Sequence, residues 1–274
     1  MQALSMSILI RPAPKPDRHI PYGSDPLQFG HLRLPAGPGP HPLAVVIHGG
    51  FWRNAYDLKH IGHLCAALTR AGMATWSLEY RRLGDQGGAW PGTFQDVARG
   101  TDHVRALAAE YPLDLAHVIT VGHSAGGHLA CWLAGRHRIP PRDILHSPDP
   151  LPLAGAVALA GVLDLARAWD LRLSKGVVCE LMGGAVEEMP ERYATASPIE
   201  LLPTGVPQWL VHGTEDGTVP YEISETYHAA ALAAGDESHL ILLRGAGHFE
   251  VIDPRSREWP QVQEAILAAA GLAS

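Results

Sequence analysis

A serine between two glycines is the first feature of the sequence that could do chemistry. Residues 117–121 form a short run with β-branched residues that leads into Gly-His-Ser-Ala-Gly at positions 122–126, and a helical sequence with Ala, Leu and Trp follows. A strand, a sharp turn and a helix in this order present the serine of a G-x-S-x-G motif as a nucleophile. Gly122 and Gly126 lie where a Cβ would crowd the crossing of strand and helix. We therefore predict that Ser124 is a nucleophile, whose hydroxyl needs a base to remove its proton.

A histidine and an aspartate that could complete such a site follow later in the chain. Residues 208–211 predict a strand that leads into an acidic turn with Asp216. Residues 240–243 predict another strand, which leads into a Gly-rich loop with His248. We expect His248 to take the serine proton and return it to the leaving group, while Asp216 orients the imidazole and stabilises its cation. The order serine, aspartate, histidine, each just past a strand, is that of α/β-hydrolases.

Two other carboxylates compete with Asp216 for the role of the acid. Glu215 is the close alternative, and Asp253 is a weaker one. We prefer Asp216 because it stands next to Gly217, past the turn. Glu215 is expected to point to solvent instead.

A Gly-Gly pair upstream predicts where a developing negative charge would bind. Residues 43–47 form an apolar strand that runs into His-Gly-Gly-Phe-Trp at positions 48–52. This sequence resembles the HGGG-type loop that donates an oxyanion-hole N–H in lipases and esterases. We expect the N–H groups of Gly50, Phe51 and Ala125 to bind the oxyanion, and the loss of one such donor typically costs on the order of 3 kcal/mol. A plain Gly-Gly turn after a strand is the alternative.

Aromatic residues close to these loops are candidates for a substrate pocket. Trp52, Tyr80 and Trp90 fit this role, although aromatic residues at such positions are as often plain packing. His123 and His128 flank the serine. We interpret His123, in the variable position of the motif, as a packing residue.

The remaining histidines and cysteines give no sign of a metal or a cofactor. His60 and His63 lie three residues apart on a predicted helix, but no third ligand is evident, and a solvated helix face is favoured over a metal site. No phosphate-binding loop or dinucleotide fingerprint is present, so no cofactor is expected. Cys65, Cys131 and Cys179 are widely spaced, which favours buried free thiols in a reducing compartment.

Length and composition are compatible with one large α/β domain. A chain of 274 residues, 46% hydrophobic and 18% charged, can form one large domain with a buried core. Its net charge of −7 and its isoelectric point near 6.1 argue against nucleic acid as a partner. No apolar run approaches the ~20 residues of a membrane span, and residues 1–10 lack the basic start of a secretory signal. We expect a cytoplasmic protein that does not bind a membrane and that acts on a small-molecule ester or amide. Its oligomeric state stays open, with a dimer as one option.

The elements that must position these residues alternate along the chain. The pattern predicts a mostly parallel central sheet with helices on both faces, in one domain over residues 1–274. Residues 1–26 are expected to form an N-terminal arm over the surface, followed by an edge strand at 27–34. Residues 163–206 contain no strong strand and predict a small lid insertion above the carboxyl ends of the strands. Helices are expected at 57–70, 93–110, 125–136, 220–234 and 261–272, and further strands at 73–80 and 154–159.

Taken together, these motifs resemble those of serine α/β-hydrolases over essentially the whole chain. The HGG-x-W sequence at 48–52 resembles that of kynurenine formamidases (arylformamidases) and of related small bacterial esterases, including feruloyl and acetyl esterase-type enzymes. Residues 210–216 and 247–249 are similar to the acid and base loops of prolyl-oligopeptidase-like hydrolases. Phe51 departs from the hormone-sensitive-lipase pattern, in which a third glycine stands at this position.

The resemblance implies the same site residues as the motifs. It implies a triad of Ser124, Asp216 and His248, with Gly50, Phe51 and Ala125 around the oxyanion. The expected activity is hydrolysis of small acyl or aryl esters through an acyl-enzyme, and the lid segment is expected to set acyl size. An arylformamidase that cleaves N-formylkynurenine is the alternative. A non-catalytic binding protein would have a broken triad, whereas all three positions are filled here.

Overall fold

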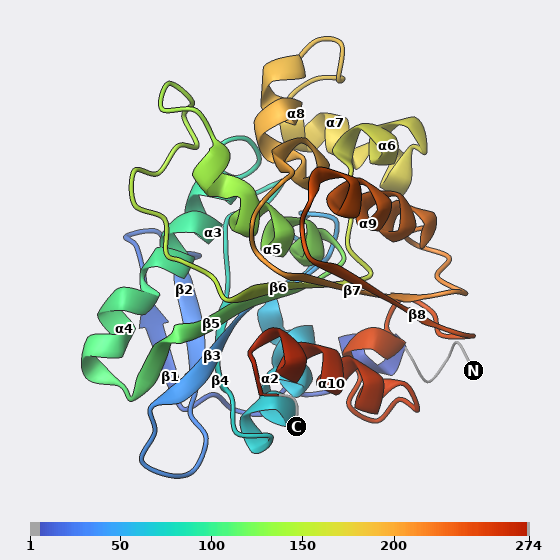
Figure 1. Cartoon of the computed structure of the whole chain (residues 1–274). Coiled ribbons are helices and arrows are strands. Elements are labelled where there is room, and N and C mark those ends of the chain that lie inside the picture. The colour runs from blue at the N-terminus through green and yellow to red at the C-terminus, as the bar shows by residue number, and fades with distance from the viewer. Residues whose placement is uncertain (1–5, 273–274) are drawn as a thin grey trace.

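A single β-sheet forms the centre of the molecule (Figure 1). The computed structural model describes residues 6–272, and the eight strands within them lie in the order β1-β2-β4-β3-β5-β6-β7-β8. Neighbouring strands from β4 to β8 run parallel, whereas β1 pairs antiparallel with β2, and β2 antiparallel with β4. The strands are β1 (Arg18–Pro21), β2 (Phe29–Arg33), β3 (His41–Ile47), β4 (Ala74–Leu78), β5 (Leu113–His123), β6 (Gly155–Leu159), β7 (Gln208–Gly213) and β8 (Ser238–Leu243).

The central strands are buried on both faces. Every residue of β4 and β6 is buried, as is every residue of β3 except one. Such continuous apolar strands are typical of a parallel sheet that carries helices on both sides, because neither face meets water. The prediction of a mostly parallel central sheet is confirmed.

Helices cover the two faces of this sheet and create two separate cores (Figure 1). One face packs against α3 (Gly92–Asp102), α4 (Val104–Glu110), α5 (Ala125–Gly135) and α9 (Glu222–Ala234). The other face packs against α2 (Gly62–Arg70) and α10 (Trp259–Ala269). No helix within residues 6–272 combines the length and apolar character that crossing a bilayer requires.

The segment predicted as a lid consists of short helices that lie near α5 and α9 (Figure 1). Hydrogen bonds fix it to α5: Trp132 Nε1 donates to the carbonyl of Thr195 at 2.9 Å, and His128 Nε2 donates to that of Ala196 at 2.9 Å. The helices are α6 (Leu165–Asp170), α7 (Val177–Met182) and α8 (Pro190–Ala196), with short 3-10 turns between and after them.

Three elements differ from the sequence prediction. The helix expected at 57–70 begins as a 3-10 helix, Leu58–Ile61, before α2. The helix expected at 93–110 is divided into α3 and α4, and the Thr101 hydroxyl, which donates to the carbonyl of Val97 at 2.8 Å, lies just before the break. Such back-bonding to the preceding turn bends helices. Within the predicted arm, residues 18–21 form β1, so β1 and not β2 is the edge of the sheet. Pro21 is tolerated there because an edge strand leaves some N–H groups unpaired.

Candidate active site

Ser124 stands at a strained turn between β5 and α5. Its backbone angles are φ 56° and ψ −119°, which are unfavourable for a residue with a side chain. Its N–H donates to the carbonyl of Leu159 at 2.8 Å, which fixes the turn to β6. A Cβ added to Gly122 would lie 1.9 Å from the carbonyl oxygen of Gly126, and one added to Gly126 would lie 2.1 Å from that of Ile47. The two glycines therefore allow the close crossing that the sequence predicted.

The histidine and the aspartate form a short hydrogen bond. His248 Nδ1 lies 2.6 Å from Asp216 Oδ2, and both side chains are buried. Because a carboxylate only accepts, Nδ1 carries the proton and donates it to Asp216. Within residues 6–272, His248 Nε2 has no hydrogen-bond partner, and Ser124 is not bonded to it.

Three further donors hold Asp216 in place. Its Oδ1 accepts from the N–H groups of Thr218 at 2.8 Å and Val219 at 2.9 Å, and His212 Nε2 lies 3.2 Å from Oδ2. Burial by itself would raise the pKa of this carboxyl, but the hydrogen bonds from His212 and His248 hold the pKa well below its ordinary value. Asp216 is therefore ionised at neutral pH. Sequence reasoning missed His212, whose signal was a histidine at the end of a strand four residues before the acid.

The two rival carboxylates lie elsewhere. Glu215 is exposed. Asp253 accepts two hydrogen bonds from Arg11, with Oδ1 at 2.9 Å from Nη2 and Oδ2 at 3.3 Å from Nη1. Neither is hydrogen-bonded to His248.

The predicted oxyanion loop follows β3 and lies against the serine turn. Gly50 and Phe51 have positive φ values of 110° and 51°. Within residues 6–272 their N–H groups donate to no backbone carbonyl. The N–H of Ala125 is likewise without an intrahelical partner, because Ala125 is the first residue of α5. A Cβ on Gly49 would lie 2.7 Å from the carbonyl oxygen of His123, so the loop is in close contact with the turn.

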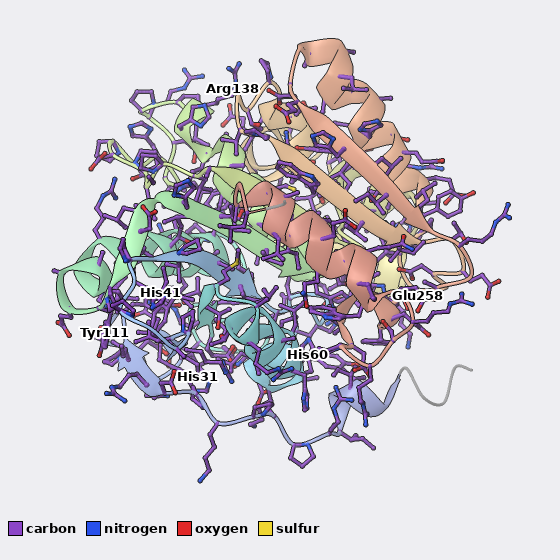
Figure 2. The ribbon with its side chains drawn as sticks, turned by 60° about the horizontal axis from the view of Figure 1, so that its bottom comes forward. His31, His41, His60, Tyr111, Arg138 and Glu258 are labelled. Carbon is purple, nitrogen blue, oxygen red and sulfur yellow. The ribbon has the colours of Figure 1, made fainter. Side chains whose placement is uncertain are left out.

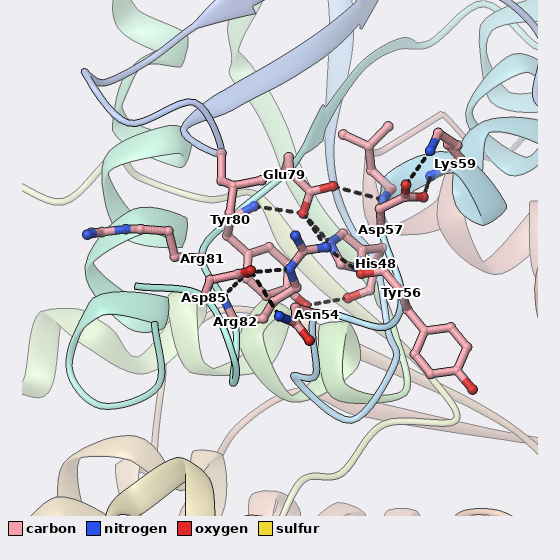
Figure 3. A network of polar contacts seen from close by, with 12 residues as sticks. His48, Asn54, Tyr56, Asp57, Lys59, Glu79, Tyr80, Arg81, Arg82 and Asp85 are labelled. Atoms are coloured by element: carbon pink, nitrogen blue, oxygen red, sulfur yellow. Dashed lines mark hydrogen bonds and ion pairs between the residues drawn. The ribbon is translucent and has the colours of Figure 1, made fainter. Parts of the chain in front are cut away.

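A buried carboxylate, Glu79, ties both ends of this loop to the core (Figure 3). Its Oε1 lies 3.0 Å from His48 Nε2 at the start of the loop, and its Oε2 accepts from the N–H of Leu58 at 3.2 Å at the other end. The N–H of Tyr80 at 3.1 Å and Arg82 Nη1 at 3.0 Å complete its surroundings. Sequence reasoning missed Glu79, since nothing in the strand pattern marks one carboxylate as buried.

His48 faces acceptors on both sides of its ring. Nδ1 lies 2.8 Å from the carbonyl oxygen of Gly49, and Nε2 lies 3.0 Å from Glu79. Both contacts are hydrogen bonds only when both nitrogens carry a proton. Burial acts to raise the pKa of Glu79, but the positive charge of His48 and its hydrogen bond lower this pKa below its ordinary value. The ionised Glu79 thus lies between the His48 ring and the Arg82 guanidinium.

Ser124 and His248 share one cavity of about 230 Å³. The two residues therefore border the same space, together with the predicted oxyanion loop. Its other walls come from segments far apart in the sequence, and no residue of 163–206 is among them. The lining residues are Leu9, Gly50, Phe51, Tyr56, His60, His123, Ser124, Thr218, His248 and Phe249.

The three aromatic residues predicted to line the pocket lie outside this cavity. Trp52 is buried and its Nε1 donates to His128 Nδ1 at 3.2 Å. Tyr80 is buried as well, and its hydroxyl donates to the carbonyl of His48 at 2.9 Å. Trp90 is partly buried against the core. These rings pack against the core beside the loop, and Phe51, Tyr56 and Phe249 are the aromatic residues of the cavity.

Two further histidines of the cavity are buried and neutral. His60 precedes α2 (Figure 2) and is only 5% exposed, so the prediction of a solvated helix face is wrong for it. Burial, with the charge of His48, lowers the pKa of His60 to about 4. His123 donates from Nε2 to the carbonyl of His248 at 2.9 Å, and burial lowers its pKa well below the ordinary value. His123 therefore fixes the backbone that carries His248.

Neither the histidines nor the cysteines gather into a metal site in the described part of the chain. No cluster of three or more His, Cys, Asp or Glu residues that could hold an ion occurs within residues 6–272. Cys65 and Cys131 are buried free thiols, and Cys179 is a partly buried one.

Comparison with known proteins shows the family of the chain. Residues 32–231 match the BD-FAE protein family. The chain belongs to this family. A probable isoprenylcysteine alpha-carbonyl methylesterase of Oryza sativa subsp. japonica is 26% identical over 247 residues, which cover 85% of this chain and 58% of the rice protein. The isoprenylcysteine alpha-carbonyl methylesterase of Arabidopsis thaliana is 25% identical and is covered to 56%. The BD-FAE chain thus spans somewhat more than half the length of these curated relatives.

Solved structures agree with the fold of this BD-FAE chain. A truncated carbohydrate esterase from gut microbiota has a TM-score of 0.77 at 22% identity, over 92% of this chain and 95% of that one. Esterase 2 of Thermogutta terrifontis, phosphonylated by sarin, has a TM-score of 0.76 at 21% identity, over 94% and 96%. These likenesses confirm the predicted α/β-hydrolase fold. The likeness to arylformamidases stays a prediction.

Proposed function

We propose that this protein is a serine carboxylesterase that hydrolyses small acyl or aryl esters with a triad of Ser124, His248 and Asp216. The observation that carries the proposal is the 2.6 Å hydrogen bond from His248 to Asp216 beside a cavity that Ser124 also lines. An ionised, fully hydrogen-bonded Asp216 keeps the proton on Nδ1 of His248. It thereby leaves the Nε2 lone pair for the serine proton.

In the proposed reaction the serine oxygen attacks the ester carbonyl while His248 Nε2 takes the serine proton. The negative charge that develops on the carbonyl oxygen would be bound by the N–H groups of Gly50, Phe51 and Ala125. His248 then returns the proton to the departing alcohol, which leaves an acyl group on Ser124. Water, activated by the same histidine, releases the acid and restores the serine.

The cavity supports a small substrate. Its volume of about 230 Å³ lies below the 300–1,000 Å³ that is usual for pockets of drug-sized ligands. The curated relatives are named for the methyl ester of isoprenylcysteine, and both comparison structures are esterases. An ester is therefore the bond that we propose. We also propose that residues 1–274 act as one domain, because all eight strands described belong to one sheet.

Hydrolysis assays with the wild type and Ser124→Ala test the proposal. The substrates are p-nitrophenyl acetate and butyrate, an isoprenylcysteine methyl ester and N-formylkynurenine. We expect wild-type turnover of the short p-nitrophenyl esters and a loss of roughly a thousandfold or more in Ser124→Ala. Full activity in a folded Ser124→Ala would disprove the mechanism. A specificity constant for N-formylkynurenine more than tenfold above that for the esters would assign the formamide instead.

A further inference from the structure

A segment near the N-terminus reaches the cavity of Ser124. The 3-10 helix η1 (Met6–Leu9) lies beside the C-terminal part of the chain, as two views agree (Figures 1 and 2). Leu9 is partly buried, packs against the core below the sheet and lines the same cavity as Ser124 and His248. An apolar side chain at this wall excludes water and takes space that a substrate could otherwise fill.

The residue before Leu9 anchors the segment. Ile8 has no exposed surface and belongs to the core formed with α2 and α10. A fully buried isoleucine cannot leave its site without exposing apolar surface to water, which is unfavourable. Ile8 therefore holds Leu9 from one side.

Polar contacts hold the segment from the other side. Arg11 binds both oxygens of Asp253, at 2.9 Å and 3.3 Å, and its Nε donates to His63 Nε2 at 3.0 Å. A guanidinium that binds two carboxylate oxygens is fixed in orientation as well as in distance. Asp253 lies five residues after His248, so Arg11 ties the segment to the part of the chain that carries the proposed base.

We infer that Leu9 limits the length of the acyl chain that the cavity accepts. The inference rests on the proposed function, since it takes the cavity as the site of the acyl-enzyme. The acyl group stays on Ser124 until water releases it, whereas the alcohol departs after the first step, so the acyl group is the part that occupies the cavity in both steps. Because the wall is a single side chain between two anchors, its size can change without loss of the segment.

The test compares acyl-chain profiles of Leu9→Ala and of a matched control. Ile10→Ala alters the neighbouring residue, which is 86% exposed and lies outside the cavity. For p-nitrophenyl esters from acetate to octanoate, Leu9→Ala removes three side-chain carbons and should lengthen the preferred chain by two or three carbons. We expect its hexanoate-to-acetate ratio of kcat/KM to rise at least tenfold, and Leu9→Phe to lower the butyrate-to-acetate ratio. Ile10→Ala should match the wild type.

A second measurement separates this inference from the proposed function. Straight-chain alkylboronic acids of two to eight carbons, which add to an active-site serine, are titrated against the same variants by calorimetry. Longer boronic acids should bind at least tenfold more tightly to Leu9→Ala than to the wild type, even if no ester is turned over. In Leu9→Ala, the hexanoate-to-acetate ratio of kcat/KM and the ratio of long-chain to short-chain boronic acid affinity are both compared with those of Ile10→Ala. If both stay within twofold, Leu9 is only a packing residue. Hydrolysis lost in Ser124→Ala would still support the proposed function in that case.

Discussion

The substitution Glu79→Gln tests how the predicted oxyanion loop is held. Glu79 is 2% exposed and accepts from both ends of the loop, at His48 and at Leu58. The glutamine side chain has nearly the same size and shape. It removes only the charge and one of the two acceptor oxygens.

The cost follows from the donors around the carboxylate. Oε1 faces three donors and Oε2 faces one, the N–H of Leu58. The amide oxygen of the introduced glutamine would keep the position with three donors, so its NH₂ group would face the N–H of Leu58, which then loses its acceptor. A buried donor without a partner costs about 1–3 kcal/mol, and loss of one member of a buried ion pair costs about 3–5 kcal/mol. These terms overlap, and we expect the free energy of unfolding to fall by about 3–5 kcal/mol.

Activity should fall as well, because the end of the loop at Leu58 is no longer fixed. We expect kcat for p-nitrophenyl acetate to fall by about 10–100-fold, which is about 1.4–2.7 kcal/mol of the barrier. KM should change little, since a preorganised oxyanion hole acts mainly in the transition state. The rate at which an organophosphate ester phosphorylates Ser124 should fall by a similar factor.

Glu180→Gln is the matched control, with the same chemical change near the same loop. Glu180 pairs with Arg53 of the loop at 2.6 Å, but the two side chains are 50% and 33% exposed. Exposed pairs contribute about 0–1 kcal/mol. Urea unfolding, followed by tryptophan fluorescence, measures both variants. If Glu79→Gln unfolds at the same urea concentration as Glu180→Gln and keeps kcat within twofold of the wild type, Glu79 does not hold the loop.

Three further outcomes follow from the structure. Asp216→Asn should lower kcat by a thousandfold or more because His248 loses the partner that fixes its tautomer. Glu215→Gln should keep kcat within about twofold, because the Glu215 side chain is exposed. Equal losses of kcat in the two variants would contradict the choice of Asp216 over Glu215. Burial lowers the pKa of His60 and His128 in the folded state to about 4, while histidine in an unfolded chain titrates near about 6.5. The unfolded state then binds more protons, so the free energy of unfolding should fall as the pH drops from about 6.5 to 4. Urea titrations should give a smaller fall for His128→Gln than for the wild type. An equal fall in both proteins would show that His128 is not a cause of the pH dependence. Gly126→Ala should yield no soluble folded protein, because its Cβ would lie 2.1 Å from a backbone oxygen; a circular dichroism melt like that of the wild type would contradict this.

Much of the fold, the turn at Ser124 and the pairing of His248 with Asp216 could be predicted because the signals are local. A strand, a glycine-flanked serine and a helix occupy one short stretch, and the strain at Ser124 follows from that order. Asp216 and His248 each follow a strand, and parallel strands bring their carboxyl ends to one edge of the sheet. The hydrogen bond between them therefore needed no knowledge of side-chain packing.

The walls of the cavity could not be predicted in the same way. Leu9 and His60 lie in different helices, and each contributes one side chain without a repeating pattern. Trp52 was a reasonable candidate by its position in the loop, but its positive φ of 56° and its hydrogen bond to His128 place the ring in the core. Burial of a single polar residue such as Glu79 likewise depends on which loop crosses above it.

The anchors of the site divide its properties into two groups. The serine turn, Asp216 and the predicted oxyanion loop are fixed by glycine packing, by His212 and by Glu79, all of which are buried. A substitution that weakens one of these anchors displaces groups that would act on the reacting carbonyl. Turnover of every substrate should then fall by a similar factor. Leu9 contacts the cavity but would contribute no group to the chemistry. Substitutions there should instead change the ratio between substrates, and the two patterns can be told apart with one series of esters.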